Sequence, residues 1–224
     1  MKNVNKKIKG VLFDMDGTMF DTETMSIYGW EVTAKKYGIT MTRDFMIGCM
    51  GLVSSAIRER FYDKYGRSFD YDQFRSDKLK VMEDVINKDG VPHKKGLIDI
   101  LDYLKESNIK CAVATSTTYS RAIFNIEKGG VLEYFDEIIS GDMVENGKPA
   151  PDIYIYAAEK LGLATDECMV LEDSRNGIIS ADLSGATAVL IPDVIPVDDD
   201  MIAAADYICD DLNQVIELIE KINK

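Results

Sequence analysis

The sequence predicts an α/β fold in which a doubly wound parallel sheet forms the core and a helical segment is inserted after the first strand. Three observations support this prediction. Short β-branched runs alternate with amphipathic stretches along most of the chain, residues 22–90 break that alternation, and 46% of the 224 residues are hydrophobic. The alternation is typical of a parallel sheet covered by helices on both faces. The hydrophobic content suffices for a large core and one smaller module.

Six apolar runs are the predicted strands, because valine, isoleucine and aromatic residues favour an extended chain. They cover residues 8–13, 110–115, 135–140, 168–173, 187–192 and 206–210. Four stretches between these runs have apolar residues at helical spacing, and several of them reach a glycine that favours a helix end. These predicted helices cover residues 97–107, 119–129, 151–162 and 174–185.

The segment at residues 22–90 contains no convincing buried strand. Three stretches in it show helical spacing, and they cover residues 23–38, 51–66 and 70–88. We therefore expect two domains. One is a discontinuous α/β core formed by residues 1–19 and 91–224, and the other is a helical domain formed by residues 20–90.

The charge and the cysteines exclude several classes of protein. The formal net charge of −13 repels nucleic acid and anionic membrane surfaces, so we expect neither as a partner. No apolar run approaches the roughly 20 residues of a membrane span, and the first residues do not fit a signal peptide. We therefore expect a cytoplasmic protein, and we expect it to be a monomer. The cysteines form no CxxC pair, which indicates reduced thiols at Cys49, Cys111, Cys168 and Cys209.

Polar side chains follow the predicted strands at their carboxyl ends, where open α/β sheets bind their ligands. The first strand runs into VLFDMDGTMFD, which places Asp14 and Asp16 directly after three apolar residues. We expect these acids to converge with a hydroxyl pair after the second strand, a lysine in the loop after the third and an acid pair at the end of the fourth. Those residues are Thr115, Ser116, Lys148, Glu172 and Asp173.

Phosphoryl transfer to a carboxylate needs this set of groups. Carboxylates from separate strands repel one another unless a cation lies between them, and hard oxygen ligands with open water positions suit Mg²⁺. One carboxylate can then attack phosphorus, because the metal and a lysine screen the approach of one anion to another. A threonine hydroxyl and backbone N–H groups can hold the phosphoryl oxygens, and a second acid can protonate the leaving alkoxide.

The same residues carry a resemblance to a known family. DMDGTMFD resembles the DxDGTxxD signature of the haloacid dehalogenase superfamily. Thr115, the GKPAPD around Lys148 and the LEDSRNGI around Glu172 and Asp173 resemble its other three motifs, in order. The resemblance covers nearly the whole chain and is closest to the β-phosphoglucomutase-like and phosphoglycolate phosphatase-like branch. It implies a Rossmann-like core and identifies the helical insert with the family's cap domain.

The resemblance also implies a role for each site residue. Asp14 would be the nucleophile that forms an aspartyl-phosphate, and Asp16 would be the general acid and then the base for the attacking water. Mg²⁺ would be held by the Asp14 carboxylate, the Asp16 main-chain carbonyl and Asp173. Glu172 would support the water shell of the metal. The phosphoryl group would be bound by Thr115, Ser116 and Lys148.

Three function classes remain open at this point. The leading one is a phosphatase acting on a small phosphorylated metabolite, the second is a sugar phosphomutase, and the third is a non-enzymatic phospho-acceptor domain. The third has no use for the second aspartate or for a cap. The mutases that the chain resembles carry a histidine where it has Ser26, and an arginine just after a glycine similar to Gly51, where it has Ser54. We therefore expect net hydrolysis. Candidate substrate-selecting residues in the insert are Glu23, Ser26, Ser54, Arg58 and Lys78, and their identities do not reveal the substrate.

Overall fold

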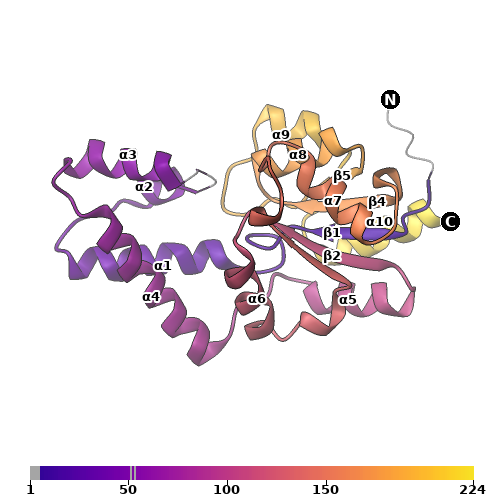
Figure 1. The fold of residues 1–224 in the computed structure, drawn as a ribbon, viewed down its shortest axis with the longest axis horizontal. Coiled ribbons are helices and arrows are strands. Elements are labelled where there is room, and N and C mark those ends of the chain that lie inside the picture. Colours follow the sequence, from indigo (N-terminus) through magenta and orange to yellow (C-terminus); the bar gives the residue numbers. More distant parts are fainter. Residues whose placement is uncertain (1–5, 51, 53) are drawn as a thin grey trace. The chain divides into compact units, whose positions relative to one another are not determined.

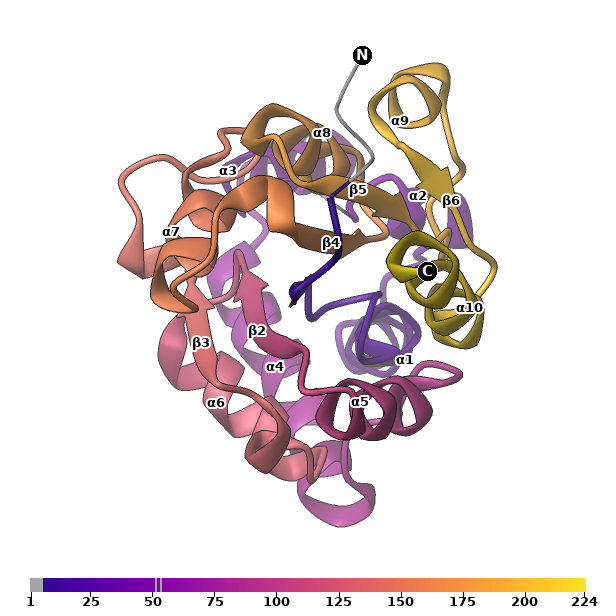
Figure 2. The same ribbon diagram turned by 90° about the vertical axis from the view of Figure 1, so that its right-hand side faces the viewer.

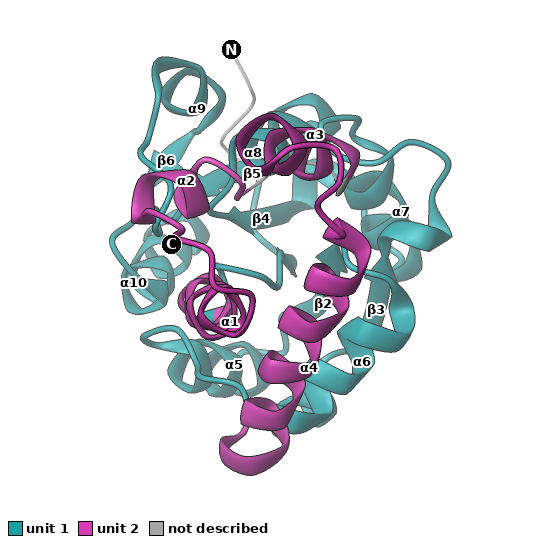
Figure 3. Cartoon of the chain, turned by 90° about the vertical axis from the view of Figure 1, so that its left-hand side faces the viewer, with its two compact units in different colours: residues 1–21, 91–224 teal, residues 22–90 magenta. Residues whose placement is uncertain are grey.

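The computed structural model describes residues 6–50, 52 and 54–224 (Figure 1). The chain divides into two compact units, one formed by residues 1–21 and 91–224 and the other by residues 22–90 (Figure 3). The first unit combines strands and helices, and the second is helical. Each unit buries apolar side chains of its own.

The described residues of the first unit form a six-stranded sheet in which every neighbouring pair is parallel. The strands are β1 (Gly10–Phe13), β2 (Lys110–Thr115), β3 (Glu137–Ser140), β4 (Cys168–Glu172), β5 (Thr187–Leu190) and β6 (Tyr207–Ile208). Their order is β3-β2-β1-β4-β5-β6, so the winding direction reverses between β1 and β4. The predicted doubly wound parallel sheet is confirmed, and most of its strands are shorter than predicted.

β1 begins later than predicted because a side chain takes over the backbone hydrogen bonds of Ile8. The Asn223 side-chain oxygen accepts from the Ile8 N–H at 2.7 Å, and the Asn223 amide nitrogen donates to the Ile8 carbonyl oxygen at 3.1 Å. An apolar run shows how far a segment is buried. It does not show where ladder pairing is replaced by a side chain from a distant part of the chain.

Helices cover both faces of this sheet (Figure 2). They are α5 (Leu97–Glu106), α6 (Tyr119–Lys128), α7 (Asp152–Lys160), α8 (Arg175–Ser184), α9 (Asp199–Ala204) and α10 (Leu212–Asn223). On one face, α7, α8 and α9 share a buried cluster with the strands, in which Leu12 and Ala114 meet Tyr154, Ile178 and Met201. On the other face α5 and α10 pack against each other, and α6 packs beside β3.

The prediction omits two helices near the C-terminus, α9 and α10. Each begins at an aspartate whose side chain accepts a backbone N–H of the first turn at 2.9 Å, Asp198 for α9 and Asp211 for α10. Aspartate is favoured at this N-cap position. The buried side chains of α10 also recur at helical spacing, as Leu212, Val215 and Ile219. Both signals are therefore readable in the sequence.

The second unit packs its helices around an aromatic core. Its helices are α1 (Thr22–Lys36), α2 (Arg43–Ile47), α3 (Ser54–Tyr65) and α4 (Tyr71–Asp89), and short α2 is absent from the prediction. α1 and α4 pack against each other. Phe61 on α3 is fully buried and lies 5.2 Å from Phe74 on α4, measured between ring centroids. Aromatic rings at such distances add to the stability gained from burial alone.

Burial explains the state of the cysteines. All four are buried and unpaired. Burial raises the pKa of both Cys111 and Cys168 to about 12, so these two thiols stay protonated and weakly reactive. In the described part of the chain, no helix has the length and apolar character needed to cross a membrane.

Candidate active site

The candidate site lies at the carboxyl end of the sheet, between β1 and β4. β1 ends at Phe13, and the N–H of Asp14 donates to the Leu171 carbonyl oxygen on β4 at 2.9 Å. Glu172 is the last residue of β4, and Asp173 follows it directly. The segments that follow β1 and β4 therefore leave the sheet side by side. Open α/β sheets bind their ligands in the crevice at such a reversal point.

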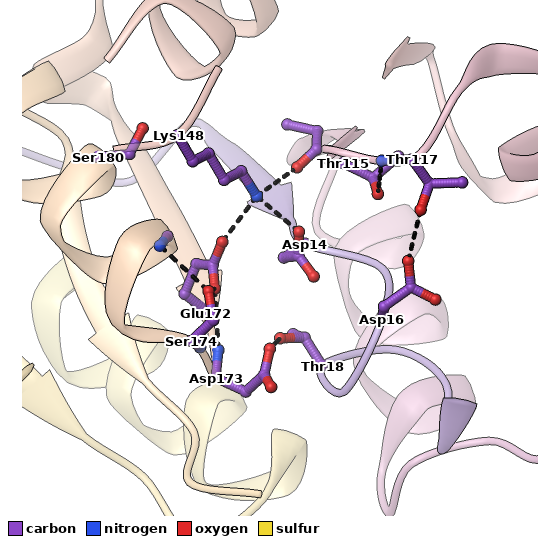
Figure 4. Close-up of polar contacts among 12 residues, drawn as sticks. Asp14, Asp16, Thr18, Thr115, Thr117, Lys148, Glu172, Asp173, Ser174 and Ser180 are labelled. Carbon is purple, nitrogen blue, oxygen red and sulfur yellow. Dashed lines mark hydrogen bonds and ion pairs between the residues drawn. The ribbon is translucent and has the colours of Figure 1, made fainter. Parts of the chain in front are cut away.

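Lys148 joins the two strands at this point (Figure 4). Its ammonium nitrogen donates to Asp14 Oδ1 at 2.5 Å, to Glu172 Oε1 at 2.7 Å and to the Ala114 carbonyl oxygen at 3.0 Å. An ammonium group has three hydrogens, so the protein itself accepts all of them. The Lys148 side chain is only 5% exposed. A charge this deeply buried depends on its paired carboxylates.

Glu172 is held on both of its oxygens. Oε1 accepts from Lys148 and from the Tyr154 hydroxyl, each at 2.7 Å. Oε2 accepts from the Asp173 N–H and from the N–H and hydroxyl of Ser174, at 3.1, 3.1 and 3.0 Å. Ser174 is also the N-cap of α8, so the carboxylate faces a helix N-terminus, which stabilises negative charge. A carboxylate has about four lone-pair sites, and the five donors around Glu172 fill them.

Burial and neighbouring charges act in opposite directions on Asp14. Burial is the largest effect, and together with the Glu172 and Asp16 carboxylates it raises the pKa of the Asp14 carboxyl group to about 8, although the Lys148 ammonium lowers it. Burial also lowers the pKa of Lys148, but Asp14 and Glu172 outweigh that effect and raise the pKa above its ordinary value. The short contact between Nζ and Oδ1 favours the ion pair. Lys148 is therefore an ammonium that opposes the effect of burial on Asp14 and favours the carboxylate form of this residue.

The turn after Asp14 brings its backbone against Asp173. Gly17 in this turn has a φ of 88°, and a Cβ atom at this position would lie 2.2 Å from Asp173 Oδ2. Only glycine meets both conditions, because it adopts positive φ readily and has no side chain. The neighbouring Thr18 hydroxyl donates to Asp173 Oδ1 at 3.1 Å. The DxDG pattern thus places the main chain of Gly17 close to the acid that follows β4.

The buried acids form a set of oxygen donors that suits a divalent cation. Asp14, Glu172 and Asp173 each offer a carboxylate oxygen, and these oxygens lie within 4.8 Å of one another. Mg²⁺ and Ca²⁺ prefer such hard oxygen ligands. Because five donors already fill Glu172, Asp14 and Asp173 are the better carboxylate ligands.

Comparison with known proteins agrees with this geometry. The sequence model of the haloacid dehalogenase-like hydrolases matches residues 11–191. The chain belongs to this family. The resemblance read from the four motifs is thereby confirmed, and the chain is a hydrolase of the haloacid dehalogenase type.

This haloacid dehalogenase-like hydrolase is similar to proteins that are named as phosphatases. The phosphorylated carbohydrates phosphatase of Thermotoga maritima is 29% identical over 182 residues, which cover 80% of this chain and 82% of that protein. The fructose-1-phosphate phosphatase of Escherichia coli is 26% identical, over 82% of this chain and 96% of that protein. A crystal structure of β-phosphoglucomutase from Clostridium difficile matches with a TM-score of 0.75 and 22% identity, over 96% of this chain and 97% of that one. That last match shows a shared fold.

The remaining predicted site residues of the hydrolase lie on the turn after β1 and at the end of β2. Thr115 is the last residue of β2 and is buried, and its Oγ1 accepts the Thr117 N–H at 3.1 Å. Ser116 follows it and is exposed. The Thr117 hydroxyl donates to Asp16 Oδ2 at 2.8 Å. Asp16 therefore belongs to a contact network with the β2 loop, separate from the network around Lys148 (Figure 4).

Sequence reasoning misses four hydroxyl groups of the candidate site, and each of them donates to a predicted carboxylate. They belong to Thr18, Thr117, Tyr154 and Ser174. Thr18 and Ser174 lie inside the quoted motifs, so their position is a usable signal. Tyr154 lies just after GKPAPD on a face that is apolar, and a buried tyrosine hydroxyl needs a partner. Thr117 carries no signal beyond its place two residues after Thr115.

The candidate residues of the helical unit are less enclosed. The Lys78 ammonium donates to the Ser26 hydroxyl oxygen at 2.5 Å, and this contact is only partly buried. Arg58 is exposed and pairs with a surface aspartate. Gly51 lies outside the described residues, and so does the side chain of Ser54.

Proposed function

We propose that this chain is a Mg²⁺-dependent phosphatase that hydrolyses a small phosphorylated metabolite, such as a sugar phosphate, through an aspartyl-phosphate on Asp14. The observation that carries the proposal is the buried contact of Asp14 Oδ1 with the Lys148 ammonium at 2.5 Å, at the reversal point of the sheet. A carboxylate nucleophile beside a cation that attracts phosphate supports phosphoryl transfer. The names of the two phosphatase relatives support a phosphorylated sugar as the substrate.

In the first step, an oxygen of Asp14 bonds to phosphorus, and the bond between phosphorus and the ester oxygen breaks. Asp16 gives its proton to that ester oxygen. The leaving group departs as a neutral alcohol, and Asp16 is left as a carboxylate. A positioned acid contributes roughly 10² to 10⁴ in rate to such a step.

Lys148 and the end of β2 hold the transferred group. The Lys148 charge offsets the negative phosphoryl oxygens as they approach the Asp14 carboxylate. Thr115 Oγ1 already accepts an N–H from Thr117, so its own hydroxyl hydrogen can donate to a phosphoryl oxygen. We assign Ser116, exposed at the end of the same strand, to the same oxygens.

In the second step, Asp16 acts as a base. It removes a proton from a water molecule whose oxygen bonds to phosphorus, and the bond between phosphorus and Asp14 breaks. Inorganic phosphate leaves, Asp14 returns to its carboxylate form, and Asp16 is protonated again. One acidic side chain therefore serves both steps, because each step returns the proton that the other one needs.

Asp14, Asp173 and the main-chain carbonyl of Asp16 would hold Mg²⁺. Bound there, the ion supplies positive charge beside the phosphoryl oxygens. The buried acid set supports this assignment, because carboxylates that share a site repel one another without a cation. Glu172 would act beside the water shell of the metal, and its two hydrogen-bonded oxygens would keep Lys148 and the start of α8 in place.

A panel of phosphomonoesters assayed with Mg²⁺ tests this proposal. We expect release of inorganic phosphate from at least one sugar phosphate, and no release by the Asp14→Asn variant prepared in parallel. The variant is nearly isosteric, so thermal melting should show that it folds. Turnover by this variant above a few per cent of the wild-type rate would exclude the aspartyl-phosphate. Absence of phosphate release from every ester, by a folded wild-type protein, would exclude the phosphatase.

A sugar phosphomutase is the alternative, because the chain shares its fold with a β-phosphoglucomutase. Ser26 disfavours it, since a serine hydroxyl cannot replace an imidazole as a base near neutral pH. Incubation with β-glucose 1-phosphate and catalytic glucose 1,6-bisphosphate separates the two functions. We expect inorganic phosphate and little glucose 6-phosphate. Rapid, stoichiometric glucose 6-phosphate without phosphate release would establish the mutase.

We also propose that the helical unit is the cap domain predicted for residues 20–90 and that it selects the substrate. It offers the cations of Lys78 and Arg58, which suit a phosphorylated or hydroxylated ligand. Exchange of residues 22–90 for the corresponding segment of the Escherichia coli relative should transfer that relative's preference for fructose 1-phosphate. A folded chimera with an unchanged preference would assign selection to the α/β unit instead.

A further inference from the structure

Thr117 contacts the acid that the proposed reaction uses twice. Its hydroxyl donates to Asp16 Oδ2 at 2.8 Å, and the two residues are 101 positions apart in the chain. Figure 4 shows the Asp16 carboxylate turned toward Thr117, on the side of Asp14 that faces away from Lys148 and Glu172. The general acid is thus held by the β2 loop rather than by the charged network.

The Thr117 hydroxyl is itself firmly placed. The Thr117 N–H donates to Thr115 Oγ1 at 3.1 Å, and its carbonyl oxygen accepts from the Gly141 N–H at 3.2 Å. The backbones are packed closely here, because a Cβ on Gly141 would lie 2.6 Å from the Ser116 carbonyl oxygen. Threonine is also stiff at χ1. The backbone therefore fixes the position from which the hydroxyl reaches Asp16.

We propose that Thr117 is a positioning residue for Asp16, which directs one carboxyl oxygen toward the leaving group. The hydroxyl donates to Oδ2 whether Asp16 is ionised or protonated, because the carbonyl oxygen of a carboxylic acid also accepts hydrogen bonds. Oδ1 is then the oxygen that carries the proton to the ester oxygen and later takes one from water. This inference rests on the proposed phosphatase reaction. The role assigned to Thr117 is to orient the Asp16 carboxyl group, not to contact the substrate.

The leaving group reveals whether the acid is correctly aimed. A sugar alkoxide is a strong base and needs a proton as it departs, whereas 4-nitrophenolate is a stable anion and needs little help. Phenolate lies between them. A defect in the acid therefore slows the three phosphate esters unequally, while a defect in phosphate binding or in folding slows them alike.

The experiment compares kcat/KM for fructose 1-phosphate, phenyl phosphate and 4-nitrophenyl phosphate, because kcat/KM reports the step in which the leaving group departs. Thr117→Val keeps the shape of the side chain and removes the hydroxyl. We expect a loss of about tenfold with fructose 1-phosphate and less than about threefold with 4-nitrophenyl phosphate, the size expected for one hydrogen bond to an ionisable group. Thr117→Ser, which keeps the hydroxyl, should restore most of the activity.

Two further variants make the result decisive. Thr118→Val is the matched control, because Thr118 is exposed and its side chain makes no capping hydrogen bond; it should change none of the three values. Asp16→Asn removes the acid itself, so it should lower kcat/KM in the same order across the three esters but by larger factors. If Asp16→Asn shows no gradation, the proposed function fails. If it does, but Thr117→Val slows all three esters equally or none of them, the inference fails. Thr117→Ala replaces the valine variant should the latter not fold, and the same outcomes apply.

Discussion

The α/β unit and the helical unit differ in the charged residues that they bury. In the α/β unit, the carboxylates of Asp14, Glu172 and Asp173 are buried beside the nearly buried Lys148. In the described part of the helical unit, the buried polar side chains are uncharged threonines, and ion pairs such as that of Arg67 with Glu59 are exposed. The difference indicates that apolar and aromatic packing stabilises the helical unit. The α/β unit instead keeps a buried charge network whose members depend on one another.

The two arrangements respond differently to the loss of one partner. Removal of one member of a buried ion pair leaves an uncompensated charge in a medium that solvates it poorly. Removal of one member of an exposed pair is compensated by water and screened by salt. Variants in the α/β unit should therefore be severe and coupled, and variants on the helical unit should be mild and separable.

The largest effect is expected at the nucleophile. Asp14→Asn should lower kcat by at least about a thousandfold, because an amide cannot form the phosphoryl ester. Stability should not fall, since the amide oxygen can still accept from Lys148 and one negative charge is lost from a crowded site. Phosphate release and thermal melting are to be measured on the same preparation. A variant that unfolds would show that Lys148 needs the charge of Asp14 in addition to that of Glu172.

Chelation should have almost as large an effect on activity. We expect EDTA to silence the enzyme and Mg²⁺ to restore it, with Ca²⁺ a poor substitute because its larger and looser coordination shell misplaces the nucleophile. The readout is phosphate release after exhaustive dialysis and metal add-back. Full activity in the chelated protein would leave the buried acids of the α/β unit without their assigned cation.

Lys148→Met and Arg67→Met test the comparison most directly, because both replace a paired cation by an uncharged chain of similar length. We expect Lys148→Met to lower the free energy of unfolding by about 3–5 kcal/mol in EDTA, since two buried carboxylates lose their cation. Arg67→Met should lower it by about 1 kcal/mol or less. Denaturant titration measures both values. Equal effects would mean that burial does not distinguish the two units.

Tyr154→Phe should have an intermediate effect. It removes the hydroxyl that donates to Glu172 Oε1 at 2.7 Å, and a hydrogen bond to a charged group contributes about 1.5–3 kcal/mol. We expect a lower melting temperature. We also expect a loss of kcat/KM that is the same for alkyl and aryl phosphates, because Tyr154 acts through Lys148 and not through the general acid Asp16. A loss graded by leaving group would place Tyr154 in the network of Asp16.

The smallest effect is expected on the helical unit. Ser26→Ala removes the oxygen that accepts from Lys78, a contact whose loss changes binding by a few-fold at most. We expect a changed KM for sugar phosphates and an unchanged kcat/KM for 4-nitrophenyl phosphate, which offers no sugar hydroxyl to select. A large loss with 4-nitrophenyl phosphate would contradict the division of labour between the units.

The fold was predictable from the sequence because its signals are local. Apolar runs located the six strands of the described sheet, and the confirmed family resemblance follows from short motifs. The helices α2 and α9 span only five and six residues, so neither has enough turns to show a periodic pattern. α10 was not predicted, although its buried residues recur at helical spacing. The expected monomeric state and cytoplasmic location stay predictions.

The sequence predicted that residues of the candidate site lie close together, but it did not predict their individual contacts. The carboxyl ends of parallel strands converge, which is sufficient to bring Asp14, Lys148, Glu172 and Asp173 together. The sequence does not reveal that the three hydrogens of Lys148 are all accepted by the protein, or that Asp16 is held by Thr117. Such pairings depend on side-chain rotamers and on residues far apart in the chain, for which composition and spacing carry no signal.

The way in which the insert is attached has a consequence for folding kinetics. The Asp21 N–H donates to the Pro92 carbonyl oxygen at 2.9 Å, and Phe20 forms a β-bridge with His93, so the chain leaves and re-enters the α/β unit at neighbouring points. β1 must pair with β2 across the whole of residues 22–90, and closing a long flexible loop slows such pairing. If α1 and α4 pack against each other first, they hold Asp21 near Pro92 and shorten the loop that remains to be closed. Early folding of the insert would then bring β1 and β2 close together and accelerate nucleation of the sheet.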